Sequence, residues 1–290
     1  CSSDLVTATV IAPVPWVPLR AAGVGTYPIW ASVPAIETRH GLTIRHPRYG
    51  HLPKFGMGLQ PWSMFRALRR EFEVLRRAGH RFDLIDAHYF YPDGVAAARL
   101  ARAVGLPYVV TARGTDLNLI PRFAGPRRRI VEAAGHASGL VTVCDALKQA
   151  LVGLGVAPAR VRVLRNGVDL DLFAPCDRAA ARRELDLEGE VWLSVGQLVE
   201  RKGHHLVVEA LARAPTATLL IAGDGPERAA LERLARRLGD APRVRFLGAV
   251  PHERLPRIYG AADVLVLASS REGWANVVLE AMACGTPVVA

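Results

Sequence analysis

Two glutamates flank an apolar segment near the carboxyl end of the sequence. In REGWANVVLEAMACG, residues 271–285, Glu272 and Glu280 are separated by seven residues. We expect a helix over 275–284, which places Glu280 about 12 Å along the chain axis from Glu272. The first backbone N–H groups of such a helix, near Asn276, lack intrahelical partners and carry the positive end of the dipole, which favours phosphate. Two carboxylates on either side of a phosphate site predict an elongated ligand with hydroxyls at both ends, such as a nucleotide sugar.

A second loop combines glycine with positive charge. In GQLVERKG, residues 196–203, Gly196 directly follows an expected strand, and Arg201 and Lys202 lie at the start of the next expected helix. Such a pair beside a free helix N-terminus can hold a diphosphate, although a solvated turn is the alternative. The turn AGDGPE, 222–227, lacks the third glycine of GxGxxG, which makes a dinucleotide-binding oxidoreductase a weaker interpretation.

The elements that must position these loops alternate between strand and helix. In the first half, strands are expected at 5–11, 42–46, 83–88, 107–112, 139–143 and 161–164; in the second, at 190–195, 217–222, 243–247, 263–267 and from Pro287. This alternation predicts an α/β fold with two doubly wound parallel sheets, whose ligands lie at the carboxyl ends of the strands. The segment RNGVDLDLFAPCD, 165–177, interrupts the pattern, so we expect domains at 1–168 and 169–290.

The clearest helix begins near residue 59. Its apolar residues predict one stripe, formed by Leu59, Trp62, Phe65, Leu68, Phe72 and Leu75. Arginines occupy much of the remaining surface, at 66, 69, 70, 76 and 77. They form either a solvated face or a contact with acidic lipid headgroups.

Composition narrows the class of protein. The net charge is +10, and lysine occurs only at positions 54, 148 and 202, so arginine supplies almost all of the positive charge. No apolar run reaches the ~18 to 20 residues that a membrane helix needs. The four cysteines, Cys1, Cys144, Cys176 and Cys284, form no CxxC pair, so neither a disulfide framework nor a zinc site is indicated. We expect a cytoplasmic protein, either free or peripheral on the inner face of the membrane.

The motifs together resemble a known enzyme family. The stretch EGWANVVLEAMACGTPVVA, preceded by RNGVDLDLF, GQLVERKG and GDGP, resembles the donor half of the glycosyltransferase family 4 enzymes, which have the GT-B fold of two Rossmann-like domains facing a cleft. In the first half, PVPWVP, HPRY, DLIDAHYFYPDG and VVTARGTDLN are similar to bacterial polysaccharide and teichuronic-acid-type members. The resemblance covers essentially the whole chain.

This resemblance implies a retaining transfer of a sugar from a nucleoside diphosphate to a hydroxyl acceptor, in the assembly of cell-surface polysaccharide or glycolipid. It assigns Glu272 to the sugar ring, Lys202 with Gly196 and Arg201 to the diphosphate, and Glu280 to the ribose. The amides around the helix start complete the donor site, at Gly273, Trp274, Ala275, Asn276 and Val277. His88 matches a catalytic position of the acceptor-side domain, and Arg113 and Asp116 match positions that face the cleft. Structural roles for His88 and Arg113 at their strand ends are the alternative.

The implied partners are a nucleotide-sugar donor and a saccharide or lipid-linked acceptor, with no nucleic acid, cofactor or metal. Three features depart from the family. Gln197 replaces a usual arginine, and many members have histidine at position 113. Members also begin with a strand, a Gly-rich loop and a helix before a segment like LVTATVIAP and continue past VVA, so the resemblance implies that both ends of the family fold are missing.

Three other interpretations stay open. Asp169 and Asp171 suggest a metal-dependent sugar transferase, because two aspartates can bind a divalent ion that clamps a diphosphate. A sugar-nucleotide epimerase can share the two-domain architecture. A non-enzymatic protein that binds charged surfaces would explain the arginines, but it leaves the paired glutamates unexplained, and the sequence contains no recognised nucleic-acid-binding motif.

Overall fold

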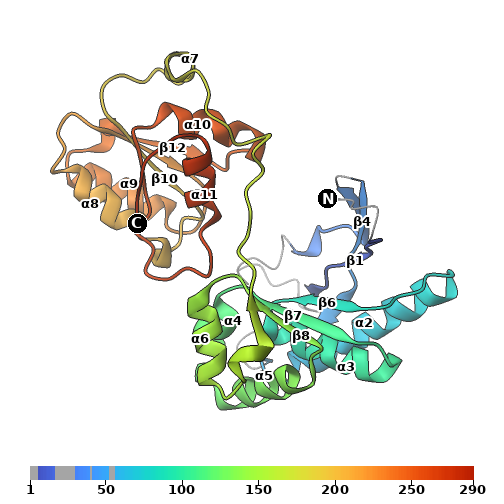
Figure 1. The fold of residues 1–290 in the computed structure, drawn as a ribbon. Coiled ribbons are helices and arrows are strands. Elements are labelled where there is room, and N and C mark those ends of the chain that lie inside the picture. Colours follow the sequence, from blue (N-terminus) through green and yellow to red (C-terminus); the bar gives the residue numbers. More distant parts are fainter. Residues whose placement is uncertain (1–5, 17–29, 40, 52–55) are drawn as a thin grey trace. The chain divides into compact units, whose positions relative to one another are not determined.

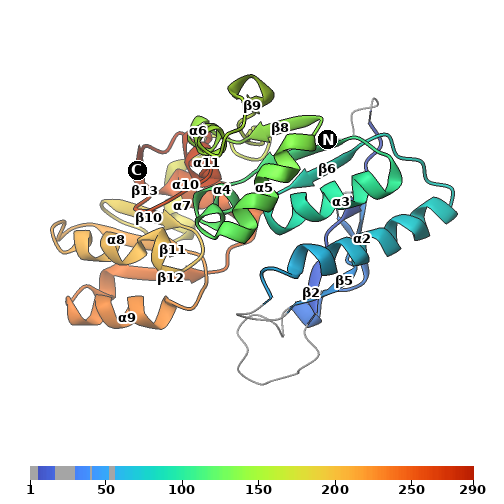
Figure 2. The same ribbon diagram turned by 90° about the horizontal axis from the view of Figure 1, so that it is seen from below.

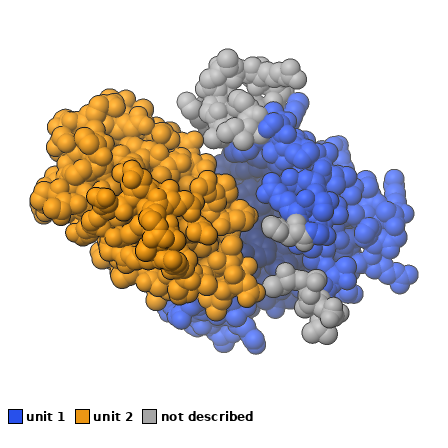
Figure 3. All heavy atoms as spheres, turned by 90° about the horizontal axis from the view of Figure 1, so that it is seen from above, with its two compact units in different colours: residues 1–165 blue, residues 166–290 orange. Residues whose placement is uncertain are grey.

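The computed structural model describes residues 6–16, 30–39, 41–51 and 56–290. The expectations that fall on Cys1, Lys54, the start of the strand at 5–11 and the end of PVPWVP lie outside the described residues. The chain divides into two compact units, residues 1–165 and 166–290, which Figure 3 distinguishes by colour.

The second unit is built on one five-stranded sheet (Figure 1). Its elements are α7 (Arg178–Glu184), β10 (Val191–Val195), α8 (His204–Leu211), β11 (Thr218–Ala222), α9 (Arg228–Arg237), β12 (Val244–Gly248), α10 (Leu255–Ala261), β13 (Val264–Val266), α11 (Asn276–Ala283) and β14 (Val288–Val289). All neighbouring strands are parallel, in the order β12-β11-β10-β13-β14. The chain therefore moves outward from β10 in one direction through β11 and β12, and in the other through β13 and β14.

Alternating residues of the central strands explain why both faces of this sheet are covered. In β11, Leu220 and Ala222 pack into a core with α7, α10 and α11, whereas Leu219 and Ile221 pack into a second core with α8 and α9. Side chains two residues apart lie on the same face of a strand, so a continuous apolar run fills both cores. Figure 2 shows α8 and α9 running beside each other, in agreement with their packing. The expected doubly wound architecture is confirmed for this unit.

The first unit contains a four-stranded parallel sheet in the order β6-β7-β8-β9. Its strands are β6 (Ile85–His88), β7 (Tyr108–Ala112), β8 (Gly139–Thr142) and β9 (Val161–Val163), and its helices are α2 (Gln60–Arg77), α3 (Val95–Val104), α4 (Thr115–Asn118), α5 (Ala124–His136) and α6 (Asp145–Gly153). Helix α2 packs on α3 through a core that includes Met64, Leu68, Phe72 and Leu100. The alternation of strand and helix predicted for this half is confirmed.

The start of the described chain departs from expectation. Within the described part of the strand predicted at 5–11, residues 6–11, only β1 (Val10–Ile11) pairs in a sheet. It joins β4 (Leu42–Arg45) and β3 (Ile36–Arg39) in a small sheet, while β2 (Val14–Trp16) pairs with β5 (Arg48–Gly50). Residues 30–51, for which the sequence predicts one strand at 42–46, therefore contain three short strands.

Helix α7 was also absent from the sequence interpretation. Its N-cap is Asp177, whose carboxylate accepts a hydrogen bond from the Ala180 amide at 3.0 Å. This interaction satisfies one of the amides that the first turn leaves unpaired, which stabilises a helix of only seven residues. An Asp that appears in the sequence as part of an interdomain turn thus begins a helix.

Candidate functional site

The strand order of the second unit creates a topological switch point between β10 and β13. Connections from these neighbouring strands leave toward opposite faces of the sheet, to α8 and to α11, so the loops after them lie at the carboxyl ends of the strands on either side of the switch point. The loop after β10 carries Gly196, Arg201 and Lys202, and the loop after β13 leads through Glu272 to α11. Both loops selected from the sequence therefore meet at the place where open α/β sheets bind ligands.

Close backbone packing holds these two loops together. Gly203 has φ +67°, and a Cβ atom there would lie 2.0 Å from the carbonyl oxygen of Ala268. The amide of Ser270 donates a hydrogen bond to the carbonyl of Arg201 at 2.9 Å. Glycine is required at 203 because a side chain would push the β13 loop away from the β10 loop.

The AGDGPE turn supports the same loop from the other side. A Cβ atom on Gly223 would lie 1.9 Å from the carbonyl oxygen of Gly196, and the amide of Leu198 donates to the carbonyl of Asp224 at 2.9 Å. The glycine therefore permits close packing of the β11 loop on the β10 loop. The sequence could not distinguish this role from that of an ordinary turn.

An ion pair joins two predicted site residues across the switch point. Lys202 Nζ lies 2.5 Å from Glu272 Oε1, and the two side chains are only 15% and 23% exposed. Gly196 borders the Lys202 side chain, because a Cβ atom on this glycine would lie at an ordinary contact distance of 3.6 Å from Lys202 Cε. Arg201 is exposed; its backbone holds the β13 loop. A half-buried ammonium group with a single carboxylate partner can exchange that partner for a phosphate.

Helix α11 begins beside this pair. Its N-cap, Ala275, has an extended backbone and offers no side-chain acceptor, so no capping side chain occupies the amides of the first turn. The residues from Gly273 to Ala275 and Val277 are partly buried, and Asn276 accepts a hydrogen bond from Asn166 at 3.1 Å. The helix start therefore combines available N–H groups with the positive end of its dipole, as predicted for a phosphate site.

Glu280 lies on the following turn and is held by residues that the sequence analysis missed. The Tyr259 hydroxyl donates to Glu280 Oε2 at 2.8 Å, and His252 Nε2 lies 3.7 Å from Oε1. Tyr259 is fully buried, and burial, followed by the nearby Glu280 charge, raises the pKa of its hydroxyl. The hydroxyl is therefore a permanent donor that fixes one carboxylate oxygen. Tyr259 belongs to no sequence motif, so its contact with Glu280 becomes visible only from its position on α10, facing α11.

In the first unit the structure brings His88 and Arg113 together at the ends of β6 and β7. Arg113 Nη2 donates to His88 Nδ1, and because arginine is always a donor, the Nε2 of His88 carries the proton and donates to Asp86 Oδ2 at 3.2 Å. This hydrogen bond from His88 lowers the pKa of Asp86. Both ring nitrogens of His88 are thus engaged, so a catalytic role for His88 requires one of these bonds to open.

Asp116 has a different environment from the one expected of a residue facing a cleft. It is fully buried, and its carboxylate accepts hydrogen bonds from the amides of Phe90, Arg113 and Gly114 at 2.8, 3.1 and 2.7 Å. Burial raises its pKa, an effect that these amides oppose. Asp116 therefore holds the loops after β6 and β7 in place, and positions Arg113 beside His88.

The aspartates considered for a metal have a local structural role. Asp169 Oδ1 accepts from the amides of Asp171 and Leu172 at 3.0 and 3.3 Å, which forms a turn before the buried Phe173. Among the described residues, no three His, Cys, Asp or Glu side chains converge on a position for a metal ion. Asp169 is thus used in the linker turn.

Two family profiles match this chain. The profile described as "Glycosyltransferase Family 4" matches residues 19–172, and "Glycosyl transferases group 1" matches residues 177–290. Among curated relatives, the D-inositol 3-phosphate glycosyltransferase of Mycobacteroides abscessus is 33% identical over 280 residues, which cover 89% of this chain and 62% of the relative. The same enzyme of Geodermatophilus obscurus is 34% identical, with the same coverage of 89% and 62%. The chain spans about 62% of the length of these relatives.

Two solved structures also resemble this chain. Anabaena HepE in complex with UDP and glucose matches with a TM-score of 0.71 and 26% identity, over 87% of this chain and 68% of that chain. Sucrose-phosphate synthase from Thermosynechococcus elongatus matches with a TM-score of 0.71 and 24% identity, over 89% and 67% of the two chains. The second likeness concerns the fold alone.

Proposed function

The chain belongs to glycosyltransferase family 4 and has the GT-B fold, and from this premise we propose that it transfers a sugar from a nucleoside-diphosphate donor to a hydroxyl acceptor with retention of anomeric configuration. The observation that carries the proposal is the Lys202–Glu272 pair at the switch point, next to the start of α11. It brings a cation and a carboxylate together beside the unpaired amides of the helix start. The UDP and glucose in the HepE structure support a donor of this class.

In the proposed donor site, each of the charged groups described for the second unit binds one part of the nucleotide sugar. Lys202 and the first amides of α11 bind the diphosphate, with Arg201 as an outer cation. Glu272, released from Lys202 by the arriving phosphate, accepts hydrogen bonds from the sugar hydroxyls. Glu280, fixed by Tyr259, accepts them from the ribose. The order of Glu272, the first amides of α11 and Glu280 along the chain supports these roles.

The proposed chemical step breaks the bond between the anomeric carbon and the phosphate oxygen, and the electron pair leaves with the diphosphate. The acceptor hydroxyl forms its new bond to the anomeric carbon on the same face, and its proton passes to a donor phosphate oxygen. Negative charge grows on the leaving group, where Lys202 and the helix dipole stabilise it. Because these groups are placed to stabilise that charge, we propose transfer without a metal ion.

We propose that the acceptor is a saccharide or a lipid-linked hydroxyl used in cell-surface polysaccharide or glycolipid assembly. The related enzymes named for D-inositol 3-phosphate make that phosphorylated polyol a second acceptor to test. His88 and Arg113 are the candidate groups of the first unit, at the carboxyl ends of β6 and β7. The unpaired cysteines at 144, 176 and 284 are consistent with a reducing, cytoplasmic setting.

Product analysis tests this proposal. The chain is incubated with UDP-glucose and, in separate reactions, with D-inositol 3-phosphate or a lipid-linked sugar, each with and without a chelator. The proposal expects a glycoside with the donor's anomeric configuration, formed only with acceptor and equally well with chelator. A changed sugar stereocentre without acceptor would instead indicate an epimerase, and loss of product with chelator would overturn metal independence.

A further inference from the structure

One face of α2 remains unexplained by the proposed transfer reaction. The sequence predicts Leu59, Trp62 and Phe65 on the buried stripe, but Leu59 is 62% exposed, Trp62 is 47% exposed and Phe65 is only partly buried. Leu68, Phe72 and Leu75 of the predicted stripe are buried, and Met64 and Ala67 are buried beside them in the packing on α3 and β5. The second half of the predicted stripe is therefore buried, whereas its first half leaves aromatic and aliphatic groups at the surface.

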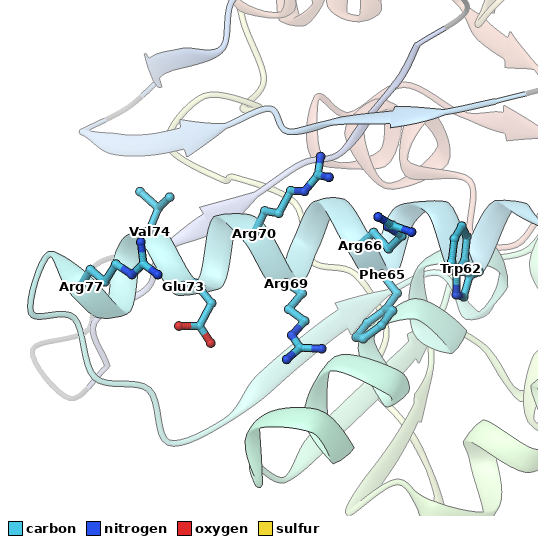
Figure 4. Close-up of a pocket in the computed structure, with 8 residues that line it drawn as sticks. All are labelled: Trp62, Phe65, Arg66, Arg69, Arg70, Glu73, Val74 and Arg77. Atoms are coloured by element: carbon cyan, nitrogen blue, oxygen red, sulfur yellow. The ribbon is translucent and has the colours of Figure 1, made fainter.

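These apolar groups share their face with arginines. Figure 4 shows the eight side chains that border an open groove of about 640 Å³, from Trp62 near one end of α2 to Arg77 near the other. They are Trp62, Phe65, Arg66, Arg69, Arg70, Glu73, Val74 and Arg77. The guanidinium of Arg66 lies 4.7 Å from the centre of the Trp62 ring, which keeps a charge directly above an exposed aromatic surface.

The charge on this face is not neutralised within the described residues. Helix α2 contains five arginines and two glutamates. Glu71 pairs with Arg45, and Glu73 pairs with Arg76 at 3.0 Å. In the part of the chain that the structure describes, no carboxylate forms an ion pair with Arg66, Arg69, Arg70 or Arg77.

From these observations we propose that this α2 face, the eight residues that border the groove, docks on an anionic lipid bilayer. Arginine heads pair with phosphate groups of the lipid surface, while their aliphatic stems and the Trp62 ring lie at the boundary with the acyl chains. An exposed tryptophan beside arginines favours lipid over nucleic acid, because an interface with both apolar and charged layers satisfies both kinds of side chain. Among the described residues, no helix has the length and apolar character that a membrane span requires.

The test measures co-sedimentation of the chain with phosphatidylcholine vesicles, with and without phosphatidylglycerol. We expect binding only to the anionic vesicles, and a decrease as salt rises. The double variant Arg69→Ala/Arg70→Ala should bind about thirtyfold more weakly, since each basic residue near an anionic surface contributes about a fivefold gain. The matched control is Arg236→Ala/Arg237→Ala, which removes two exposed arginines from α9 and should bind like the unmodified chain.

A second variant separates lipid docking from attraction to any polyanion. Trp62→Ser keeps all arginines, and we expect it to weaken vesicle binding several-fold while leaving binding to heparin unchanged. Equal loss in the α2 and α9 double variants would overturn the proposal, because it would show dependence on net charge alone. No effect of Trp62→Ser would also overturn it, since the occupant would then be a soluble polyanion. Unchanged melting temperatures establish that the variants are folded.

Discussion

Lys202 and Glu272 are separated by 70 positions in the sequence, yet Lys202 Nζ lies 2.5 Å from Glu272 Oε1. The pair connects the loop after β10 to the loop after β13, at the switch point of the parallel sheet. The two charges of the pair neutralise each other. A nucleoside diphosphate must therefore compete with Glu272 for Lys202.

This competition gives the first prediction. Glu272→Gln removes the carboxylate that occupies Lys202 and repels phosphate, so UDP without a sugar should bind about three- to tenfold more tightly. Sugar transfer should fall by about a hundredfold or more, because the contact with the sugar ring is lost. Calorimetric titration with UDP and initial rates with the UDP-sugar measure the two effects. Weaker UDP binding in this variant would contradict a competing role for Glu272.

The sequence anticipated the strands around this site but not the pair itself. Long apolar runs such as TLLIA mark strands because both faces of a parallel sheet are covered, and glycines mark the turns that follow. The contact of Lys202 with Glu272 depends on β10 and β13 being neighbours, and the order of strands in a sheet is a tertiary property. The sequence does not predict the role of Tyr259 for the same reason, since its partner Glu280 lies on a different helix.

The exposed first half of the predicted α2 stripe and the short helix α7 show where a local sequence pattern is not enough to predict the structure. Spacings of three and four predict an apolar face, but the packing on α3 and β5 decides which part of that face is buried. For α7, the N-cap Asp177 was present in the sequence within a segment rich in turn residues. Both the cap and a turn use aspartate in the same way, so tertiary packing selected the helix.

Tyr259 should position Glu280 for the ribose. Tyr259→Phe removes only the hydroxyl that donates to Oε2, and we expect about three- to tenfold weaker binding of UDP. Pyrophosphate has no ribose, so its affinity should be unchanged by the same substitution. Comparing the two ligands by calorimetry distinguishes a positioning role from general loss of structure, which would weaken both.

The stability of the first unit should depend on the ionisation of Asp93. Burial, with a contribution from the Asp116 charge, raises the pKa of Asp93 from 3.8 to about 6. A carboxyl with a raised pKa in the folded state contributes stability below its unfolded pKa, and this contribution is lost as pH rises through the folded value. Asp93→Asn should therefore increase the free energy of unfolding by about 1–3 kcal/mol at pH 7.5.

At pH 4 the same substitution should have little effect, because Asp93 is then protonated and uncharged in the folded chain. Urea denaturation at the two pH values measures the difference. A gain of equal size at both pH values would show that the stabilisation has another cause than removal of a buried charge.

Replacing Gly203 by alanine should strongly destabilise the fold. A Cβ atom would lie 2.0 Å from the Ala268 carbonyl oxygen, and the backbone has φ +67°. We expect Gly203→Ala to lower the free energy of unfolding by more than about 3 kcal/mol. The matched control is Gly239→Ala, where φ is +77° and nothing lies within 4 Å of the added atom. Its cost should be about 1 kcal/mol, from backbone strain alone. Similar losses in the two variants would mean that the β10 and β13 loops can separate freely.

The most direct measurement is calorimetric titration of the chain with UDP-, GDP- and ADP-sugars, repeated with Lys202→Ala and Glu280→Gln. A donor site at the β10–β13 switch point predicts that one nucleotide class binds, and that each substitution weakens it at least about tenfold. Binding of a nucleotide sugar with unchanged affinity in both variants, or the absence of binding by all three classes, would contradict that site.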